Sequence, residues 1–224
     1  MTHRLLDLFC GAGGAGVGYA RAGFEVIGVD HRPQPHYPFE CVCADAIEFV
    51  TQHGNEFDAI HASPPCQAYT GLRHVTLSRF GHAPDHPDLI AVTRAALVAT
   101  GRVYVIENVR GAPLRTTVIL HGVMFGLPHL WRARHFESNV LLLAPPGPRR
   151  VAGYTIGVYG SRPDGRRVSY RHHRPSRVAN SLAEARVAMG IDWMGWDEIT
   201  QAVPPAYTDY IGQQLITYLE RCES

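Results

Sequence analysis

Residues 4–30, RLLDLFCGAGGAGVGYARAGFEVIGVD, decide the fold of this chain. The apolar run at 4–9 predicts a buried strand, and the glycine-rich turn at 11–18 leads into a short helix. A second apolar run at 25–29 predicts another strand, which ends at Asp30. Glycines in such a turn let the backbone approach a ligand, and the acid can hold ribose hydroxyls. The stretch indicates a nucleotide-like cofactor and leaves both NAD and S-adenosylmethionine open.

The rest of the chain continues the alternation of strands and helices. Strands are predicted at 40–43, 57–61 and 103–107, and helices at 87–100, 182–189 and 205–221. This alternation predicts an α/β protein with a doubly wound, mostly parallel sheet. Ligands of such sheets lie at the carboxyl ends of the strands, where the polar clusters described below also fall.

The composition is that of a globular protein. The 224 residues are 46% hydrophobic and 18% charged, with a mean hydropathy of −0.10. No run of about 18 apolar residues occurs, so we expect no membrane helix. The short N-terminal apolar run does not resemble a secretory signal, and the five cysteines are irregularly spaced, so we expect a cytoplasmic protein. No metal is expected, because the spacing of His31, His36, Cys41 and Cys43 matches no standard zinc site.

Arginine is unevenly distributed, and lysine is absent. The whole chain carries a net charge of +1, but residues 144–180 hold eight arginines and a single acid, Asp164. This segment begins with the proline cluster at 144–148, which marks a composition boundary. An arginine-rich segment suits a polyanion such as nucleic acid, and a solvated loop is the alternative.

Two polar clusters follow predicted strands. In Ser63-Pro64-Pro65-Cys66-Gln67, two prolines stiffen the turn that presents Cys66. A thiolate there can act as a nucleophile, although most intracellular cysteines are simply small buried side chains. Glu107 and Asn108 end a later strand, where a buried carboxyl beside an amide can bind the edge of a base.

Three further residues are candidates by position. Arg132 and Arg134 precede a strand predicted at 135–136, and alternate residues of a strand project to one face. We therefore expect both guanidinium groups to point at one ligand. Asp45 follows the third strand and can accept from an adenine amino group or cap a helix.

Together these motifs resemble the cytosine-C5 DNA methyltransferase family, and the chain looks closest to its short, phage-type members. The motifs occur in family order and span residues 5–219: DLFCGAGGAGVGYARAGFEVIGVD, SPPCQAYT, VIENV, FGLPHLWRARHFES and QAVPPAYTDYIGQQL. Two positions depart from the family pattern. Leu130 stands where Gln usually precedes the first arginine, and Thr200-Gln201 replace the usual Gly-Asn.

The resemblance implies a Rossmann-like class I methyltransferase fold with a small target-recognition insertion. The expected domains are an S-adenosylmethionine-binding catalytic domain at 1–136, a small basic target-recognition segment at 137–200, and a C-terminal helix at 201–224 that returns to the catalytic domain. The expected partner is double-stranded DNA in a bacterial or phage-infected cell, without a membrane, and the oligomeric state is open. The implied cofactor-binding residues are Phe9, Gly11, Gly13, Asp30, Asp45 and Pro65.

The resemblance also implies roles for the catalytic residues. Cys66 would add to C6 of a flipped-out cytosine, and Glu107, protonated because burial raises its pKa, would donate to N3. Asn108 would hold the loop or the base, Arg134 would grip O2, and Arg132 would hold a phosphate or the loop. A long connection at 68–86, which includes Arg73, Arg79 and His82, would close over DNA. The small basic segment would specify about two to four base pairs.

Three alternative functions account for parts of the sequence. A nicotinamide-dependent dehydrogenase accounts for the glycine turn and Asp30 but leaves the Cys66 and Glu107 motifs unexplained. RNA or a free nucleotide could replace DNA as substrate, although the basic segment favours a polymer. A non-catalytic regulator would normally lack the nucleophile or the acid, and both are present.

Overall fold

The computed structural model describes residues 2–66, 88–146, 153–169 and 175–223. Their large sheet contains β1 (Arg4–Leu8), β2 (Glu25–Asp30), β3 (Glu40–Cys43), β4 (Ala59–Ala62), β5 (Val103–Asn108), β6 (Thr117–Leu120) and β7 (Arg134–Ser138). Their small sheet contains β8 (Thr155–Gly157), β9 (Arg167–Ser169) and β10 (Pro175–Val178). The α-helices are α1 (Gly14–Ala22), α2 (Ala46–His53), α4 (Leu89–Thr100), α5 (Leu182–Met189), α6 (Trp196–Ile199) and α7 (Pro205–Glu223), and the 3₁₀ turns are η1 (Gly54–Glu56) and η2 (Gly122–Phe125).

The large sheet has the strand order β3-β2-β1-β4-β5-β7-β6. The first five strands in this order are parallel to one another, and β7 runs antiparallel to both β5 and β6. The prediction of a doubly wound, mostly parallel α/β sheet is therefore confirmed. The order reverses between β1 and β4, which is the point where open sheets of this kind bind ligands.

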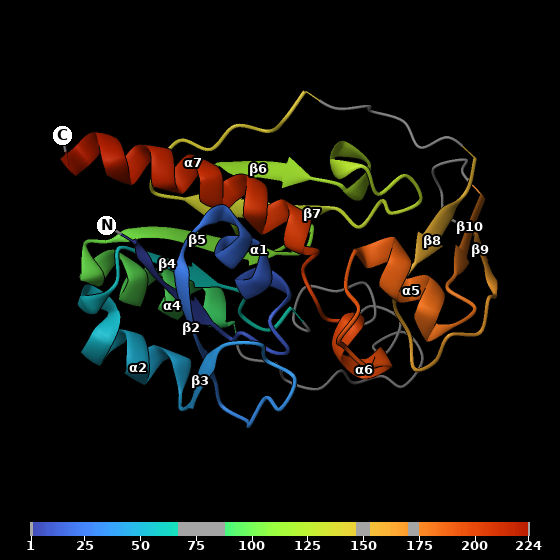
Figure 1. Ribbon diagram of the computed structural model, residues 1–224, viewed down its shortest axis with the longest axis horizontal. Helices are drawn as coiled ribbons and strands as arrows, with labels where there is room; N and C mark the ends of the chain where they lie inside the picture. Colours follow the sequence, from blue (N-terminus) through green and yellow to red (C-terminus); the bar gives the residue numbers. More distant parts are fainter. Residues whose placement is uncertain (1, 67–87, 147–152, 170–174, 224) are drawn as a thin grey trace.

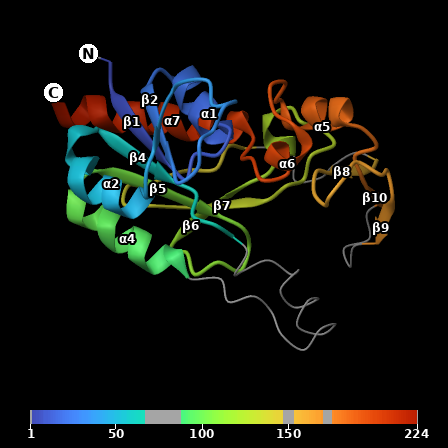
Figure 2. The same ribbon diagram turned by 90° about the horizontal axis from the view of Figure 1, so that it is seen from below.

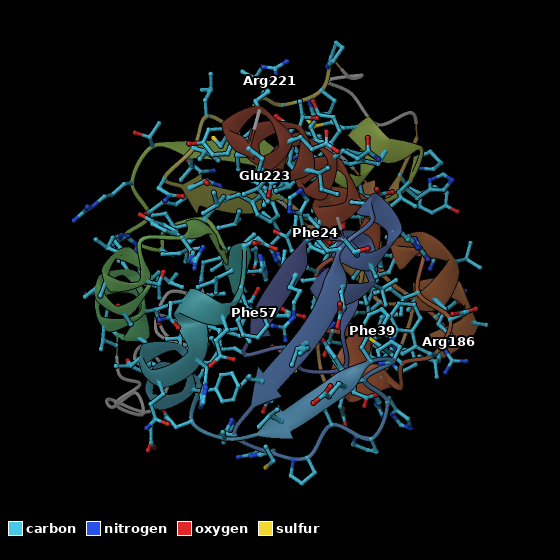
Figure 3. The ribbon with its side chains drawn as sticks, turned by 60° about the vertical axis from the view of Figure 1, so that its left-hand side comes forward. Phe24, Phe39, Phe57, Arg186, Arg221 and Glu223 are labelled. Carbon is cyan, nitrogen blue, oxygen red and sulfur yellow. The ribbon has the colours of Figure 1, made fainter. Side chains whose placement is uncertain are left out.

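Helices cover both faces of the large sheet. Figure 2 shows α1 and α7 on one face and α2 and α4 on the other. Each face has its own apolar core, because these strands are buried on both sides. Phe24 belongs to the core beside α7 and Phe57 to the core beside α2, and Figure 3 shows them in these two places. The resulting three-layer sandwich holds the strand ends rigidly at one edge.

The glycine turn needs backbone conformations and close contacts that a residue with a Cβ atom adopts only at a cost in free energy. Gly13 caps α1 with φ +85, and a Cβ there would lie 2.8 Å from the Pro38 ring. Further along α1, a Cβ on Gly18 would lie 2.0 Å from Thr208 Oγ1. Thr208 in turn donates to the Ala15 carbonyl at 2.9 Å, so α1 and α7 meet at backbone distance.

The small sheet, α5 and α6 form a second region beside the large sheet (Figure 1). Its apolar core includes Ile156, Met189 and Met194, and it also takes in Ala12 of the glycine turn. Trp193 Nε1 donates to the Ala12 carbonyl at 2.8 Å. The second region is therefore packed directly onto the turn that follows β1.

Several element boundaries differ from the sequence expectations by one or two residues. The strand predicted at 57–61 is β4, which begins at Ala59 because Phe57 is packed in the core beside α2. The boundary expected between residues 136 and 137 falls inside β7, which continues to Ser138 through its pairing with β5.

Candidate active site

A pocket of about 430 Å³ opens at the carboxyl ends of β1, β4 and β5. The segments that follow these three strands form one side of it. The opposite side comes from residues between 194 and 203, which connect α5 to α7 through α6. Of the sequence-predicted site residues, those that line the pocket are Phe9, Gly11, Asp30, Pro65, Cys66, Glu107, Asn108 and Arg134.

The β1 end of the pocket is organised by Asp30. Asp30 Oδ2 accepts from the Gly11 amide at 3.1 Å, and Oδ1 accepts from the Arg32 amide at 3.1 Å. These bonds fix the carboxylate at the end of β2, where it is 8% exposed. Phe9 and Gly11 have positive φ values of 57 and 49, which turn the chain sharply after β1. A Cβ on Gly11 would meet no atom within 4 Å, so the turn borders open space.

Asp7 also lines the pocket and was not among the predicted residues. It is fully buried in β1, and its Oδ2 accepts from the Tyr37 hydroxyl at 3.1 Å. Burial raises the pKa of Asp7 to about 8. Its Oδ1 has no hydrogen-bond partner among the described side chains. The signal for Asp7 was a single acid inside an otherwise apolar strand.

Asn108 holds the turn that carries Cys66. Its Nδ2 donates to the Pro64 carbonyl at 2.8 Å, and its Oδ1 accepts from the Val109 amide at 2.9 Å. Asn108 is 1% exposed, so these bonds are shielded from water. The end of β5 and the turn after β4 are thereby locked together, with Cys66 and Glu107 on the same pocket.

Glu107 and Arg134 form a buried charge pair. Arg134 Nε lies 2.8 Å from Glu107 Oε1, and Glu107 is 5% exposed. Burial raises the pKa of Glu107 above its ordinary value, and the opposing effect of Arg134 is smaller. Oε1 makes no hydrogen bond within the described part of the chain, despite the short distance to Arg134. The site thus has a buried carboxyl and a cation side by side on the pocket.

Cys66 is half-buried on the same pocket. Burial raises the pKa of the thiol, and Glu107 acts in the same direction. Arg134 and Arg132 act in the opposite direction, because a nearby cation favours a thiolate. The protein without ligand therefore holds a protonated thiol beside two guanidinium groups.

Three predicted residues do not line the pocket. Gly13 belongs to the glycine turn but packs against Pro38. Asp45 is exposed and caps α2, accepting from the Ile47 and Glu48 amides at 2.9 Å each. Its Oδ1 therefore caps the helix, and the contact between Asp45 and an adenine amino group stays a prediction.

Arg132 corrects the expectation that both guanidinium groups point at one ligand. It donates to the carbonyls of Ala202, Val158 and Thr200 at 3.1, 2.8 and 2.7 Å. Its φ is +21, and β7 begins two residues later, so the alternation of a strand does not apply to it. Arg132 ties the second region to the large sheet.

The wall formed by residues 194–203 contributes polar groups that sequence reasoning did not assign. Asp197, Glu198 and Gln201 all line the pocket. Glu198 Oε1 also pairs at 2.8 Å with Nδ1 of His36, which lies in the β2–β3 connection. Proximity between such distant segments comes from packing, and no local pattern predicts it.

No other site of comparable chemistry is evident in the described residues. Within residues 2–66, 88–146, 153–169 and 175–223, no group of three or more His, Cys, Asp or Glu side chains is arranged to hold a metal ion. No helix among them is long and apolar enough to cross a membrane. The predicted loop at 68–86, with Arg73, Arg79 and His82, lies outside the described residues.

The whole architecture is shared with solved methyltransferase structures. A protein encoded within an E. coli prophage and described as a DNA modification methyltransferase matches with a TM-score of 0.60 at 15% identity, covering 98% of this chain and 100% of that one. The Dnmt2 methyltransferase of S. pombe matches with a TM-score of 0.56 at 13% identity, covering 98% and 99%. A DNMT2 variant from Spodoptera frugiperda gives 0.53 at 13% identity, covering 98% and 100%. At these identities the likeness shows a common Rossmann-like fold.

Comparisons of sequence alone find no counterpart. No family model matches the chain, and no curated protein matches it.

Proposed function

We propose that this protein is an S-adenosylmethionine-dependent DNA methyltransferase that acts on C5 of cytosine. The observation that carries the proposal is the convergence of Cys66, Glu107 and Arg134 on the pocket that also contains Asp30 and Gly11. A nucleophile, a buried acid and a cation next to a nucleotide-type turn match the needs of this reaction. A dehydrogenase would use the glycine turn and Asp30, but its reaction would give no role to Cys66 and Glu107.

The pocket suits S-adenosylmethionine. Asp30 keeps lone pairs that can accept from ribose hydroxyls, and the turn at Gly11 borders open space for the ligand. Glu198 adds a further acidic side chain, which favours a ligand with a sulfonium and an ammonium group. When bound, this cofactor supplies an electrophilic methyl group. Solved methyltransferases of the same fold support the choice.

Cys66 is the nucleophile in this proposal. C5 of cytosine is a weak nucleophile, and bond formation between the Cys66 sulfur and C6 makes C5 enamine-like. The free thiol first loses its proton to solvent, and the two guanidinium groups near it favour that loss. After C5 has taken the methyl group, elimination across the C5–C6 bond restores the aromatic ring. The C5 proton leaves to solvent, the C6–S bond breaks to release the Cys66 thiolate, and the N3 proton returns to Glu107.

Glu107 protonates N3 as the sulfur adds. A carboxyl can donate only while it is neutral, and burial raises its pKa in that direction. Arg134 lies beside it and would contact the cytosine O2, where negative charge also collects. A cytosine inside a stacked duplex cannot reach these groups, so the base must be flipped out into the pocket.

Arginines of the 144–180 segment would bind the DNA backbone. Arg162 and Arg166 are exposed, whereas Arg177 forms a two-pronged ion pair with Glu184 and stacks on Tyr154. Arg177 is thus committed to the second region and is a poor phosphate contact. The other arginines of the segment are Arg149, Arg150, Arg171 and Arg174, which lie outside the described residues, and Arg167, whose side chain is not described.

The chemistry is tested by methylation and trapping. We expect methyl transfer to cytosine in a random DNA library, read by bisulfite sequencing, and a covalent adduct with DNA that contains 5-fluorocytosine. Cys66→Ser should bind the cofactor but neither methylate nor form the adduct. An active preparation that forms no adduct, or that methylates RNA and leaves DNA unmodified, would overturn the assignment.

The DNA contacts are tested by salt dependence. Each phosphate contact releases counterions, so Arg162→Ala should lower the slope of log affinity against log salt by about 1. Arg177→Ala is the matched control and should leave the slope unchanged. We expect a target of about two to four base pairs, because a recognition segment of this size can contact the edges of only a few bases. A long, rare target would contradict that expectation.

A further inference from the structure

A chain of three side chains leads from the interior of the protein to Glu107. Tyr19 on α1 and His61 on β4 are both fully buried, and the Tyr19 hydroxyl lies 3.0 Å from His61 Nδ1. On the other side of the ring, His61 Nε2 lies 2.8 Å from Ser63 Oγ. Ser63 lines the pocket, and its hydroxyl acts as a donor toward the Glu107 carboxyl, which lowers the pKa of Glu107. The proposed mechanism gives His61 no role of its own.

The direction of these hydrogen bonds follows from the protonation of each group. Burial raises the pKa of Tyr19 well above its usual value, so the phenol keeps its proton. Burial lowers the pKa of His61 to about 3, so the ring is neutral and has one N–H. Within the described residues, His61 Nδ1 is the hydrogen-bond partner of the Tyr19 hydroxyl, and donation by Tyr19 places the ring proton on Nε2. Nε2 then donates to Ser63, which leaves the Ser63 proton for the Glu107 carboxyl.

This chain acts on the Glu107 carboxyl through Ser63, and Arg134 acts on the same carboxyl at Oε1. Oε1 lies 2.8 Å from Arg134 Nε and has no hydrogen-bond partner among the described residues. Donation by Ser63 stabilises the charged carboxylate and so opposes the effect of burial on the Glu107 pKa. A donor that is itself hydrogen-bonded is polarised and donates more strongly.

We propose that Tyr19, His61 and Ser63 are positioning residues that orient the Glu107 carboxyl and tune its acidity. The inference rests on the proposed role of Glu107 as proton donor. The other titratable or charged groups that act on Glu107, or that Glu107 acts on, are Arg132, Arg134, Cys66 and Tyr207. All four are retained in the variants below.

The experiment follows two signals in the full chain. Carbon-13 NMR of labelled glutamate side chains titrates Glu107, whose signal is the one lost in Glu107→Gln. Nitrogen-15 NMR of histidine reports which His61 nitrogen carries the proton. The same samples are used for single-turnover methylation of cytosine in DNA as a function of pH. The variants are Ser63→Ala, its matched control Ser63→Thr, which keeps the hydroxyl, and Tyr19→Phe.

We expect a neutral His61 ring protonated on Nε2, and a Glu107 pKa that rises by about half a pH unit or more in Ser63→Ala. The alkaline limb of the rate profile should move to higher pH by the same amount, because Glu107 stays protonated longer. Ser63→Thr should behave as the parent protein, and Tyr19→Phe should shift Glu107 less, in the same direction.

Two results would overturn the inference. A ring proton on Nδ1 would reverse the hydrogen bonds, and an unchanged Glu107 pKa in Ser63→Ala would leave the chain with a structural role. Both signals are measured without turnover. A parent protein that shows the expected NMR behaviour but methylates no cytosine would therefore refute the proposed function and leave the hydrogen-bond chain in place.

Discussion

Replacement of Glu137 by glutamine should destabilise the fold strongly. Arg94 Nε and Nη2 on α4 donate to the two Glu137 oxygens on β7 at 2.6 and 2.8 Å, and the Arg115 amide adds a bond of 2.6 Å. Glu137 is 2% exposed and Arg94 is 9% exposed. Glu137→Gln leaves the Arg94 charge in this buried site without a counter-ion. Loss of one partner of such a pair costs about 3–5 kcal/mol of the free energy of unfolding.

Urea unfolding of the parent and variant measures this cost. The matched double variant Arg94→Met with Glu137→Leu removes both charges, and its free energy of unfolding should lie within about 2 kcal/mol of the parent value. A loss below about 1 kcal/mol in Glu137→Gln, or a double variant less stable than the single one, would refute the reasoning.

The same pair gives the stability a predictable dependence on pH. Arg94 and the Arg115 amide hold the pKa of Glu137 below its ordinary 4.5. An acid whose pKa is lowered in the folded state adds stability above its unfolded pKa, and this is lost as pH falls through the folded pKa. The difference between the parent and Glu137→Gln should be constant near neutral pH and shrink below about pH 4.5.

Three further predictions concern the pocket. Glu107→Gln should lower turnover by about 10²-fold or more, because an amide cannot transfer a proton, and near-normal turnover would make Glu107 structural. Asp30→Ala should weaken S-adenosylmethionine binding by about 1.5–3 kcal/mol in calorimetry, and an unchanged affinity would assign the ribose to another acid. Asp7→Asn should change the pH dependence of stability. The folded protein keeps the Asp7 proton up to about pH 8, whereas the unfolded chain releases it near pH 3.8. The free energy of unfolding should therefore decline between these pH values in the parent and not in the variant. Equal slopes of the free energy of unfolding against pH in the two proteins would contradict the burial argument.

The sheet was predictable because its signals are local. Each element near the N-terminus is predicted by a pattern of only a few residues. The apolar run at 4–9 predicts β1, the glycine turn predicts the start of α1, and the apolar run at 25–29 predicts β2. The placement of Cys66 and Glu107 on one pocket follows from the rule that parallel strands end at the same edge. Local patterns together with topology therefore account for one side of the pocket.

The remaining features depend on contacts that no local pattern contains. Arg132 was expected to alternate with Arg134, but its conformation is not extended and its guanidinium binds three carbonyls of the second region. The capping role of Asp45 depended on helix α2, which was not among the predicted helices. Glu198 reaches the pocket because Trp193 and the apolar core around it pack onto the glycine turn.

The Trp193 bond to Ala12 has a consequence for how the protein is made. Ribosomes add about 5–20 residues per second to a growing chain. The pocket wall at 194–203 is therefore complete about 9–35 s after Asp30 has been made. During this interval the nascent chain has the glycine turn and Asp30 but lacks the opposite wall and the α7 helix that supports α1. The complete pocket therefore forms only after residues 194–203 have been made, and a premature stop before residue 194 would leave the glycine turn without the Trp193 side chain that packs on it.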